Sequence, residues 1–343
     1  MPKPFLVRSK RNYGTSSIPL SRELSKKSLK HYLITSSIAT ELGIATQCYF
    51  GIQKEFTQFV RLIQAGRYPD IQALEQSLGS LVNSVIRNPA ASVWLSRLKS
   101  KSSYTYRHCV ASAILCCVMG RQLGLELSEL KQLSLAGLLM DCGKVLLPNT
   151  LLRKKEKLSE EELQLAQSHI ELGIKSLRKL CLPDTVIDTI KYHHERYDGS
   201  GYPEKLEGTH IPLFARIAGI VDSYDAMVSP RFHAAPVPHN EALKKLASFR
   251  DTLFQKELVD IFIQAIGLYP PGSLVELTNG EVGVVTNINS GSDRKPEVKI
   301  ILDASKKRLS RRIVLNLEEA GHNTDIAKTL PPDAYNLDPE ALL

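Results

Sequence analysis

The sequence predicts a mainly α-helical protein that ends in a small antiparallel β-module. From about residue 31 to 265, apolar residues recur at every third or fourth position, which is the period of helices with one buried face. After Tyr269-Pro270-Pro271-Gly272 the pattern changes to alternating apolar and polar residues, as in half-buried strands. The chain has 343 residues and 43% hydrophobic content, enough to bury a substantial core.

Residues 1–30 form a basic arm. Eight Lys or Arg residues and one acid give this arm a net charge of +7, which accounts for nearly all of the total of +8. The arm offers little that could pack, so we expect it to be flexible. Its charge could neutralise phosphates of nucleic acid or anionic lipid. A solvated tail explains the same charge, and we favour the tail over contact with nucleic acid or a membrane.

The helical part shows breaks and start signals. Residues 71–98 read as a pair of helices, or one broken helix, interrupted near Asn88-Pro89. Ser159 followed by Glu162 has the form of a capping box, and Asp184 after Pro183 would serve as an N-cap. These signals divide the region into many short helices rather than a few long ones.

The β-module begins with a hairpin signal. The stretch 274–285 alternates around Asn279-Gly280, a pair that favours tight hairpin turns. Two further strand-like runs follow at Val298–Leu302 and Arg312–Leu317. The predicted organisation is a basic arm (1–30), an N-terminal helical region (31–100), a central helical domain (101–268), the β-module (269–320) and a C-terminal tail (321–343).

The cysteines and the apolar runs bear on the compartment. The six cysteines form no CxxC pair and lie mostly among apolar residues, so we expect reduced, buried thiols in a cytoplasmic protein. No apolar stretch follows the basic arm as in a secretory signal. The longest apolar run, Val110–Gly120, is far shorter than the roughly 20 residues that cross a bilayer. We therefore expect no transmembrane segment.

Several polar residues that could hold a metal fall on apolar helix faces. His193 and His194 are adjacent and precede an acid and a glycine-rich loop closed by Gly201-Tyr202-Pro203. His169 has small neighbours on its helix face. Asp222 lies on a stripe of small residues, Ala215, Ala218, Gly219 and Ala226, which favours tight packing around an internal carboxylate.

His108 begins one apolar helix and Asp141 ends another. Taken alone, such a histidine is usually a hydrogen-bonded core residue, Asp141 could cap a helix, and Lys144 would be solvated. Together, four imidazoles and two carboxylates at half-buried positions carry a large desolvation cost unless they are paired or metallated. The sequence therefore predicts a metal site. Imidazole and carboxylate ligands without thiolate suit Mn, Fe, Zn or Mg-like ions, and we expect Cys142 to point away.

The spacing of these motifs resembles the HD-GYP family of the HD phosphohydrolase superfamily, bacterial enzymes that hydrolyse cyclic di-GMP. The resemblance covers roughly residues 85–320 and implies an HD-type helical bundle. It rests on five segments: Tyr104–His108, Gly137–Lys144, Ser168–Gly173, His193–Pro203 and Ala215–Ala226.

The resemblance also implies roles for individual residues. Asp141 would bridge two metal positions, one with His108 and Asp222 and the other with the three remaining imidazoles. The implied metal ligands are His108, Asp141, His169, His193, His194 and Asp222. Asp141 and Lys144 would act in catalysis, and Lys144, Tyr202 and Arg231 would bind substrate. The cofactor would be one or two divalent ions per chain, Fe or Mn.

Met140 departs from the family pattern, because it stands where the family has the histidine of its HD pair. A thioether is a weak, soft donor for such ions. One hypothesis is therefore a cyclic di-GMP phosphodiesterase with lowered activity that yields a linear dinucleotide. The other is an inactive member that senses cyclic di-GMP or binds a protein partner through the Gly201-Tyr202-Pro203 loop. We favour the enzyme, because most metal positions survive, and leave a homodimer open.

Overall fold

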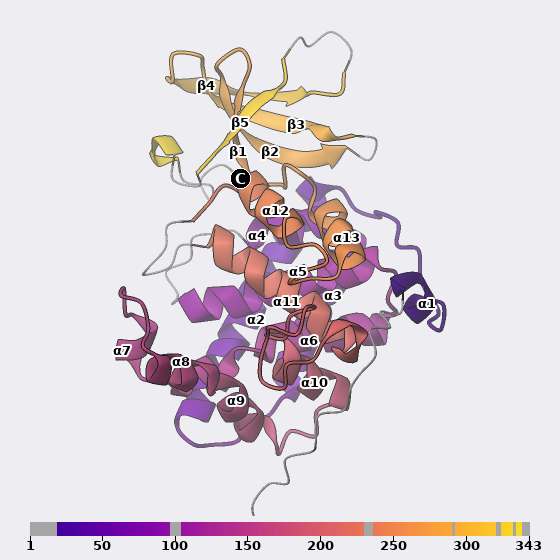
Figure 1. Cartoon of the computed structure of the whole chain (residues 1–343). Coiled ribbons are helices and arrows are strands. Elements are labelled where there is room, and N and C mark those ends of the chain that lie inside the picture. The colour runs from indigo at the N-terminus through magenta and orange to yellow at the C-terminus, as the bar shows by residue number, and fades with distance from the viewer. Residues whose placement is uncertain are drawn as a thin grey trace, which may run out of the picture.

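The computed structural model describes residues 19–96, 104–229, 236–289, 292–319, 324–331 and 334–337. Helices make up the described chain as far as Ile266, and strands begin at Leu274. The helices form a bundle, and the sheet stands at one end of it (Figure 1). The predicted fold class, mainly α with a small antiparallel β-module after the helices, is confirmed.

Helices of varied length build the bundle. They are α1 (Leu20–Leu24), α2 (Ile38–Gln64), α3 (Gln72–Arg87), α4 (Pro89–Leu95), α5 (Tyr104–Gln122), α6 (Leu127–Leu139), α7 (Asn149–Leu152), α8 (Glu160–Gln167), α9 (His169–Leu177), α10 (Asp184–Tyr192), α11 (Leu213–Val228), α12 (His239–Ala247) and α13 (Lys256–Ile266). Short 3₁₀ turns are η1 (Cys142–Leu146), η2 (Gly208–His210) and η3 (Ala334–Asn336).

Helix α5 is the centre of the bundle. Every residue from His108 to Gly120 is buried, as expected of a helix that is apolar on all sides. Helices α2, α3, α4, α6, α11 and α13 pack around it. A polar side chain on α5 is therefore held inside the protein rather than at its surface.

The predicted helix signals are confirmed with one exception. Helix α3 ends at Arg87 and α4 begins at Pro89, with the Asn88 side chain accepting the backbone N–H of Ala90. The capping box at Ser159 is present. The prediction for Asp184 is wrong: it is the first residue of α10 and its side chain caps nothing, because the preceding proline occupies the N-cap position.

Residues 19–30, the last part of the predicted arm, contact the bundle. Leu20 is buried in the main core. Both carboxylate oxygens of Glu23 accept hydrogen bonds at 2.7 Å from the guanidinium of Arg216 on α11. The backbone N–H of Lys30 donates to the carbonyl of Gly124. Residues 1–18 of that arm lie outside the described residues.

Among the described residues, the sheet has five strands in the order β4-β3-β2-β1-β5. They are β1 (Leu274–Leu277), β2 (Val282–Asn289), β3 (Ser292–Leu302), β4 (Arg308–Asn316) and β5 (Ile326–Leu330). β1 and β2 form the predicted hairpin, with Val275 opposite Gly283. β5 pairs with β1 inside the stretch assigned to a tail. Its residues, Ile-Ala-Lys-Thr-Leu, do not alternate between apolar and polar, so the pattern gave no strand signal.

Two further sequence-based expectations concern the cysteines and the membrane. All six cysteines are free, and four of them are completely buried. The expectation of buried thiols is wrong for Cys181, which is exposed, and Cys48 is only half-buried. None of the described helices combines the length and the apolar character needed to cross a bilayer.

Candidate metal centre

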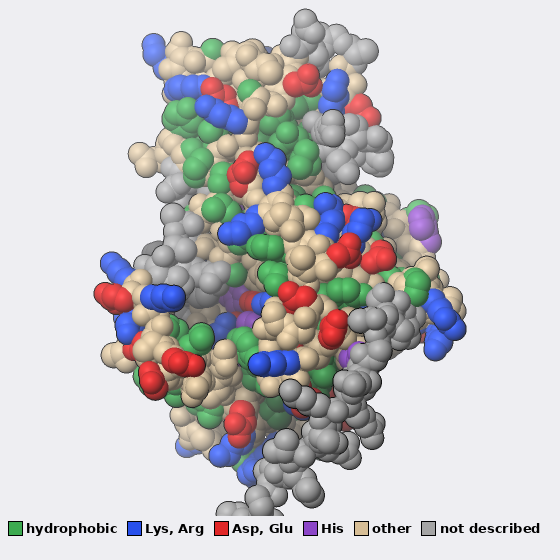
Figure 2. All heavy atoms as spheres, viewed as in Figure 1, with side chains coloured by type: hydrophobic (Ala, Val, Ile, Leu, Met, Phe, Trp, Pro, Cys, Tyr) green, Lys and Arg blue, Asp and Glu red, His purple; other side chains and the backbone are tan. Residues whose placement is uncertain are grey.

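Elements far apart in the sequence bring the predicted ligands together. His108 lies on α5, Asp141 precedes η1, His169 starts α9, His193 and His194 follow α10, and Asp222 lies on α11. Figure 2 shows histidine, acidic and basic side chains together in a hollow of the helical part. Asp141 and His193 are fully buried and His108 and His169 are 2% exposed, so hydrogen bonds within the protein or a bound ion must replace the lost hydration of these groups.

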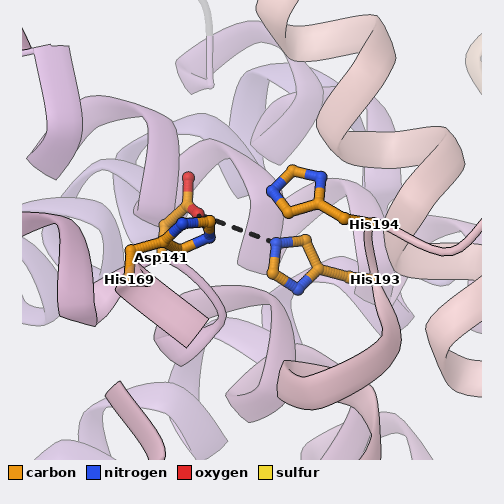
Figure 3. A group of neighbouring side chains, drawn as sticks. All are labelled: Asp141, His169, His193 and His194. Carbon is orange, nitrogen blue, oxygen red and sulfur yellow. Dashed lines mark ion pairs between the residues drawn. The ribbon is translucent and has the colours of Figure 1, made fainter. Parts of the chain in front are cut away.

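Four side chains form what we call the three-imidazole group: Asp141, His169, His193 and His194 (Figure 3). One ligand atom from each lies within 4.8 Å of all the others. Asp141 Oδ1 is 3.4 Å from His169 Nε2 and 3.7 Å from His193 Nε2. These separations are too long for hydrogen bonds and leave room for an ion between the atoms.

The backbone fixes which ring nitrogens face this centre. His169 Nδ1 lies 2.7 Å from the carbonyl oxygen of Ala166, and His193 Nδ1 lies 2.8 Å from that of Ile190. A carbonyl can only accept, so each Nδ1 carries the proton and each Nε2 presents a lone pair. Both Nε2 atoms and Asp141 Oδ1 are buried without a hydrogen-bond partner among the described residues. Three converging acceptors of this kind fit a cation.

Three side chains form a second set, which we call the His108 group: His108, Asp141 and Asp222. His108 Nε2 lies 3.1 Å from Asp141 Oδ2 and 3.2 Å from Asp222 Oδ1. The two groups share Asp141 and use different oxygens of its carboxylate. His194 links them again, because its Nδ1 is 3.7 Å from Asp222 Oδ2.

Asp225 is a part of the site that the sequence analysis missed. Its Oδ2 lies 2.6 Å from His108 Nδ1, and the residue is 3% exposed. A carboxylate behind an imidazole in this way orients the ring and increases its strength as a ligand. The available signal was the spacing, since Asp225 follows Asp222 by three residues and so shares its helix face.

The electrostatics hold the candidate ligands in the forms that bind metal. Burial alone would raise the pKa of Asp141, but the Lys144 ammonium and the His108 ring outweigh burial and hold that pKa well below its usual range. Burial would also raise the pKa of Asp222, but its interaction with the His108 ring outweighs burial and lowers that pKa. Burial lowers the pKa of His169 to about 4 and that of His194 well below normal. At neutral pH the acids are therefore anionic and these two rings neutral.

Two glycines permit the close packing on which this geometry depends. A Cβ on Gly143 would lie 1.9 Å from the carbonyl oxygen of His169, so η1 and α9 can meet only because residue 143 has no side chain. A Cβ on Gly219 would lie 2.8 Å from the carbonyl oxygen of His193, which holds the end of α10 against α11. The glycines therefore set the spacing between the elements that carry the ligands.

The chain is similar in sequence and fold to known proteins. Residues 88–258 match the model of an HD domain, and residues 274–336 match a KOW domain associated with the HD domain. A cyclic di-GMP phosphodiesterase of Pseudomonas aeruginosa, PA4108, is 36% identical over 254 residues, which cover 74% of this chain and 61% of that protein. A solved HDG"Y"P protein of Bdellovibrio bacteriovorus, Bd1817, matches with a TM-score of 0.53 and 20% identity over 64% of this chain and 70% of its own.

The chain belongs to the HD-GYP family. A 3'3'-cGAMP-specific phosphodiesterase of Vibrio cholerae is 28% identical over 65% of this chain and 44% of its own length. The chain thus spans less than two thirds of each of these two curated relatives. At 20% identity the likeness to Bd1817 shows the shared fold alone.

The Gly-Tyr-Pro loop of this HD-GYP chain lies against the metal centre. The Tyr202 ring stacks on the His194 ring with centroids 4.8 Å apart and an angle of 27°. The buried Glu195 carboxylate holds the loop by accepting the backbone N–H groups of Glu204 and Leu206. A Cβ on Gly201 would lie 2.4 Å from the Arg196 nitrogen, so the turn needs glycine there. The loop therefore contacts the three-imidazole group through the rings of Tyr202 and His194.

The remaining predicted site residues lie in different places. Lys144 reaches Asp141, with its Nζ 2.5 Å from Oδ2 and its side chain 27% exposed. Met140 and Cys142 are fully buried in the main hydrophobic core and belong to neither ligand group. Arg231 lies outside the described residues, so its phosphate contact stays a prediction.

Proposed function

We propose that this chain is a metal-dependent phosphodiesterase that hydrolyses cyclic di-GMP to a linear dinucleotide. One observation carries the proposal: Asp141 Oδ1, His169 Nε2 and His193 Nε2 converge as buried acceptors without hydrogen-bond partners among the described residues. Support also comes from relatives named as cyclic di-GMP phosphodiesterases in Pseudomonas aeruginosa and Thermotoga maritima, the latter 32% identical over 162 residues.

The three-imidazole group would hold a divalent ion, which we propose to be Fe or Mn, because its donors are imidazole nitrogens and carboxylate oxygens. A bound ion supplies Lewis acidity and positive charge to a phosphodiester. Thiolate ligation is not proposed, because Cys142 is buried in the apolar core.

Lys144 and Tyr202 would position the substrate. The Lys144 ammonium is part-exposed beside the shared carboxylate, where it can pair with a phosphate oxygen. The Tyr202 ring, half-buried and stacked on His194, offers a flat surface beside the same centre. Arg231 is proposed as a second phosphate contact on the sequence resemblance alone.

A turnover assay tests the proposed reaction. Protein loaded anaerobically with Mn²⁺ or Fe²⁺ should convert cyclic di-GMP to linear dinucleotide, and a chelator should abolish this conversion. Because one relative is named for 3'3'-cGAMP, both cyclic dinucleotides should be compared at equal concentration. Absence of cyclic di-GMP turnover at high enzyme and metal would refute the proposal, whether or not the other cyclic dinucleotide is hydrolysed.

The second candidate is an inactive member that binds cyclic di-GMP or a protein partner through the Gly-Tyr-Pro loop. Met140 favours it, because this buried thioether adds no donor beside Asp141. The variant Met140→His separates the two candidates. A large gain from near-zero turnover supports the inactive member, whereas substantial turnover before the change supports the enzyme.

A homodimer is also proposed and is tested by the mass of the protein in solution.

A further inference from the structure

The two oxygens of the Asp141 carboxylate have different surroundings. Oδ1 faces the Nε2 atoms of His169 and His193 at 3.4 and 3.7 Å. Oδ2 faces His108 Nε2 at 3.1 Å and the Lys144 ammonium at 2.5 Å. One oxygen therefore borders a space bounded by lone pairs, while the other already contacts a positive charge.

The fold keeps Lys144 at this oxygen. Its backbone N–H donates to the carbonyl of Asp141 at 3.0 Å, so η1 places the lysine side chain back over the carboxylate. Gly143 packs η1 against the carbonyl of His169, with no room for a Cβ. The backbone contacts thus place the main chain of Lys144 within reach of the carboxylate, and the ion pair with Asp141 Oδ2 holds the ammonium there, although the side chain is 27% exposed.

The two ligand groups differ in how many donors they can give an ion. The three-imidazole group offers four, enough to hold an ion while leaving positions open for water or substrate. The His108 group offers three, and one of them, Asp141, is shared. Met140, next to the shared carboxylate, is buried in the hydrophobic core and supplies only a weak thioether.

The charges of the site agree with this difference. Asp141, Asp222 and Asp225 are buried carboxylates around His108. With a neutral His108 ring, one divalent ion together with the Lys144 ammonium balances these three negative charges in the substrate-free site. A second divalent ion would leave an excess of positive charge in a largely desolvated space, which is unfavourable.

We propose that Lys144 serves as the second cation of this site, so that each chain holds one divalent ion, in the three-imidazole group, instead of two. This inference rests on the proposed function only in assuming that the centre binds a metal. Lys144 neutralises Asp141 Oδ2 on the side of the His108 group, where a second ion would otherwise be needed.

Counting Mn²⁺ on metal-stripped, full-length protein tests the proposal. Equilibrium dialysis should find one tightly bound Mn²⁺ per chain, and the electron paramagnetic resonance spectrum should be that of an isolated ion even with excess Mn²⁺. Two tight ions with a spin-coupled spectrum would overturn the proposal. If such protein still hydrolyses cyclic di-GMP, the proposed function stands; if no ion binds at all, both fail.

Substitutions at Lys144 give a second, independent readout. Lys144→Gln should strengthen binding of a second Mn²⁺ at least tenfold and produce spin coupling, and adding Met140→His should strengthen it further. Lys144→Arg should keep the single isolated ion of the wild type, because arginine keeps the positive charge that Lys144→Gln removes. Lys154→Gln is the matched control, since Lys154 pairs with Glu162 outside both ligand groups. Unchanged second-ion affinity in a folded Lys144→Gln protein would show that Lys144 is no substitute for a metal.

Discussion

The three-imidazole group and the His108 group share one carboxylate but differ in what their ring nitrogens face. In the first, His169 and His193 donate Nδ1–H to backbone carbonyls and turn bare Nε2 atoms toward the centre. In the second, both ring nitrogens of His108 lie within 3.2 Å of carboxylate oxygens. His108 also turns its Nε2 toward Asp141, but on that side the Lys144 ammonium already contacts the same carboxylate oxygen. The comparison teaches that ligand type alone does not define a metal position, because a neighbouring charge can already satisfy the carboxylate.

The largest expected effect is at the residue common to both groups. Asp141→Asn removes the negative charge while keeping the shape, so both groups lose their shared anionic ligand. Metal affinity should fall by more than about 100-fold, and turnover with it, as measured by equilibrium dialysis and product formation. Asp260→Asn, which removes one surface ion-pair partner of Arg250, should leave both unchanged. Tight metal binding in Asp141→Asn would contradict the geometry.

Comparing His169→Gln with His108→Gln separates the two groups. His169→Gln should lower the affinity for the first ion by about 100-fold, because it removes one of four donors from the complete set. His108→Gln should change that affinity by less than about tenfold, since His108 lies on the side of Lys144. Metal titration of both proteins measures the difference. Equal losses would mean that the groups act as one dinuclear unit.

Asp225 should matter through His108. Asp225→Asn replaces the carboxylate behind the ring with a neutral amide, which orients it less firmly. Because His108 holds no ion in the proposed one-ion site, turnover should fall by less than about tenfold, while the affinity for the first ion stays near that of the wild type. Steady-state kinetics and metal titration on the same preparation measure both effects. Loss of the first ion in this variant would place His108 in the same coordination set as His169.

The smallest effect concerns the close contact between η1 and α9. Gly143→Ala forces a Cβ against the His169 carbonyl and should destabilise the protein by about 1–3 kcal/mol, seen as a lower Tm. Gly79→Ala is the control. A Cβ there would meet only Lys131, at 3.9 Å, and Ala in α3 should stabilise by up to about 1 kcal/mol. An unchanged Tm in Gly143→Ala would mean that η1 can move away from α9.

Sequence patterns predicted the fold class and most of the residues that come together in the metal centre. Helical periodicity placed His169 and Asp222 on buried faces, and desolvation cost then predicted a shared centre. Periodicity could not reveal that Lys144 lies on Asp141, because that contact depends on the tight turn of η1. It also could not assign Asp225 to His108, since residues 117 positions apart meet only through the packing of α5 against α11.

The ion pair between Glu23 and Arg216 makes the beginning of the described chain part of the scaffold of the site. Arg216 is 3% exposed in its side chain and lies on α11, within two turns of Asp222. Trimming the protein to start at residue 31 would remove the counter-charge of this guanidinium, which keeps its hydrogen bonds to Ile211 and Gln255, a loss of roughly 1.5–3 kcal/mol. Inactivity after such trimming would therefore report a loosened α11 rather than a lost contact with nucleic acid or lipid.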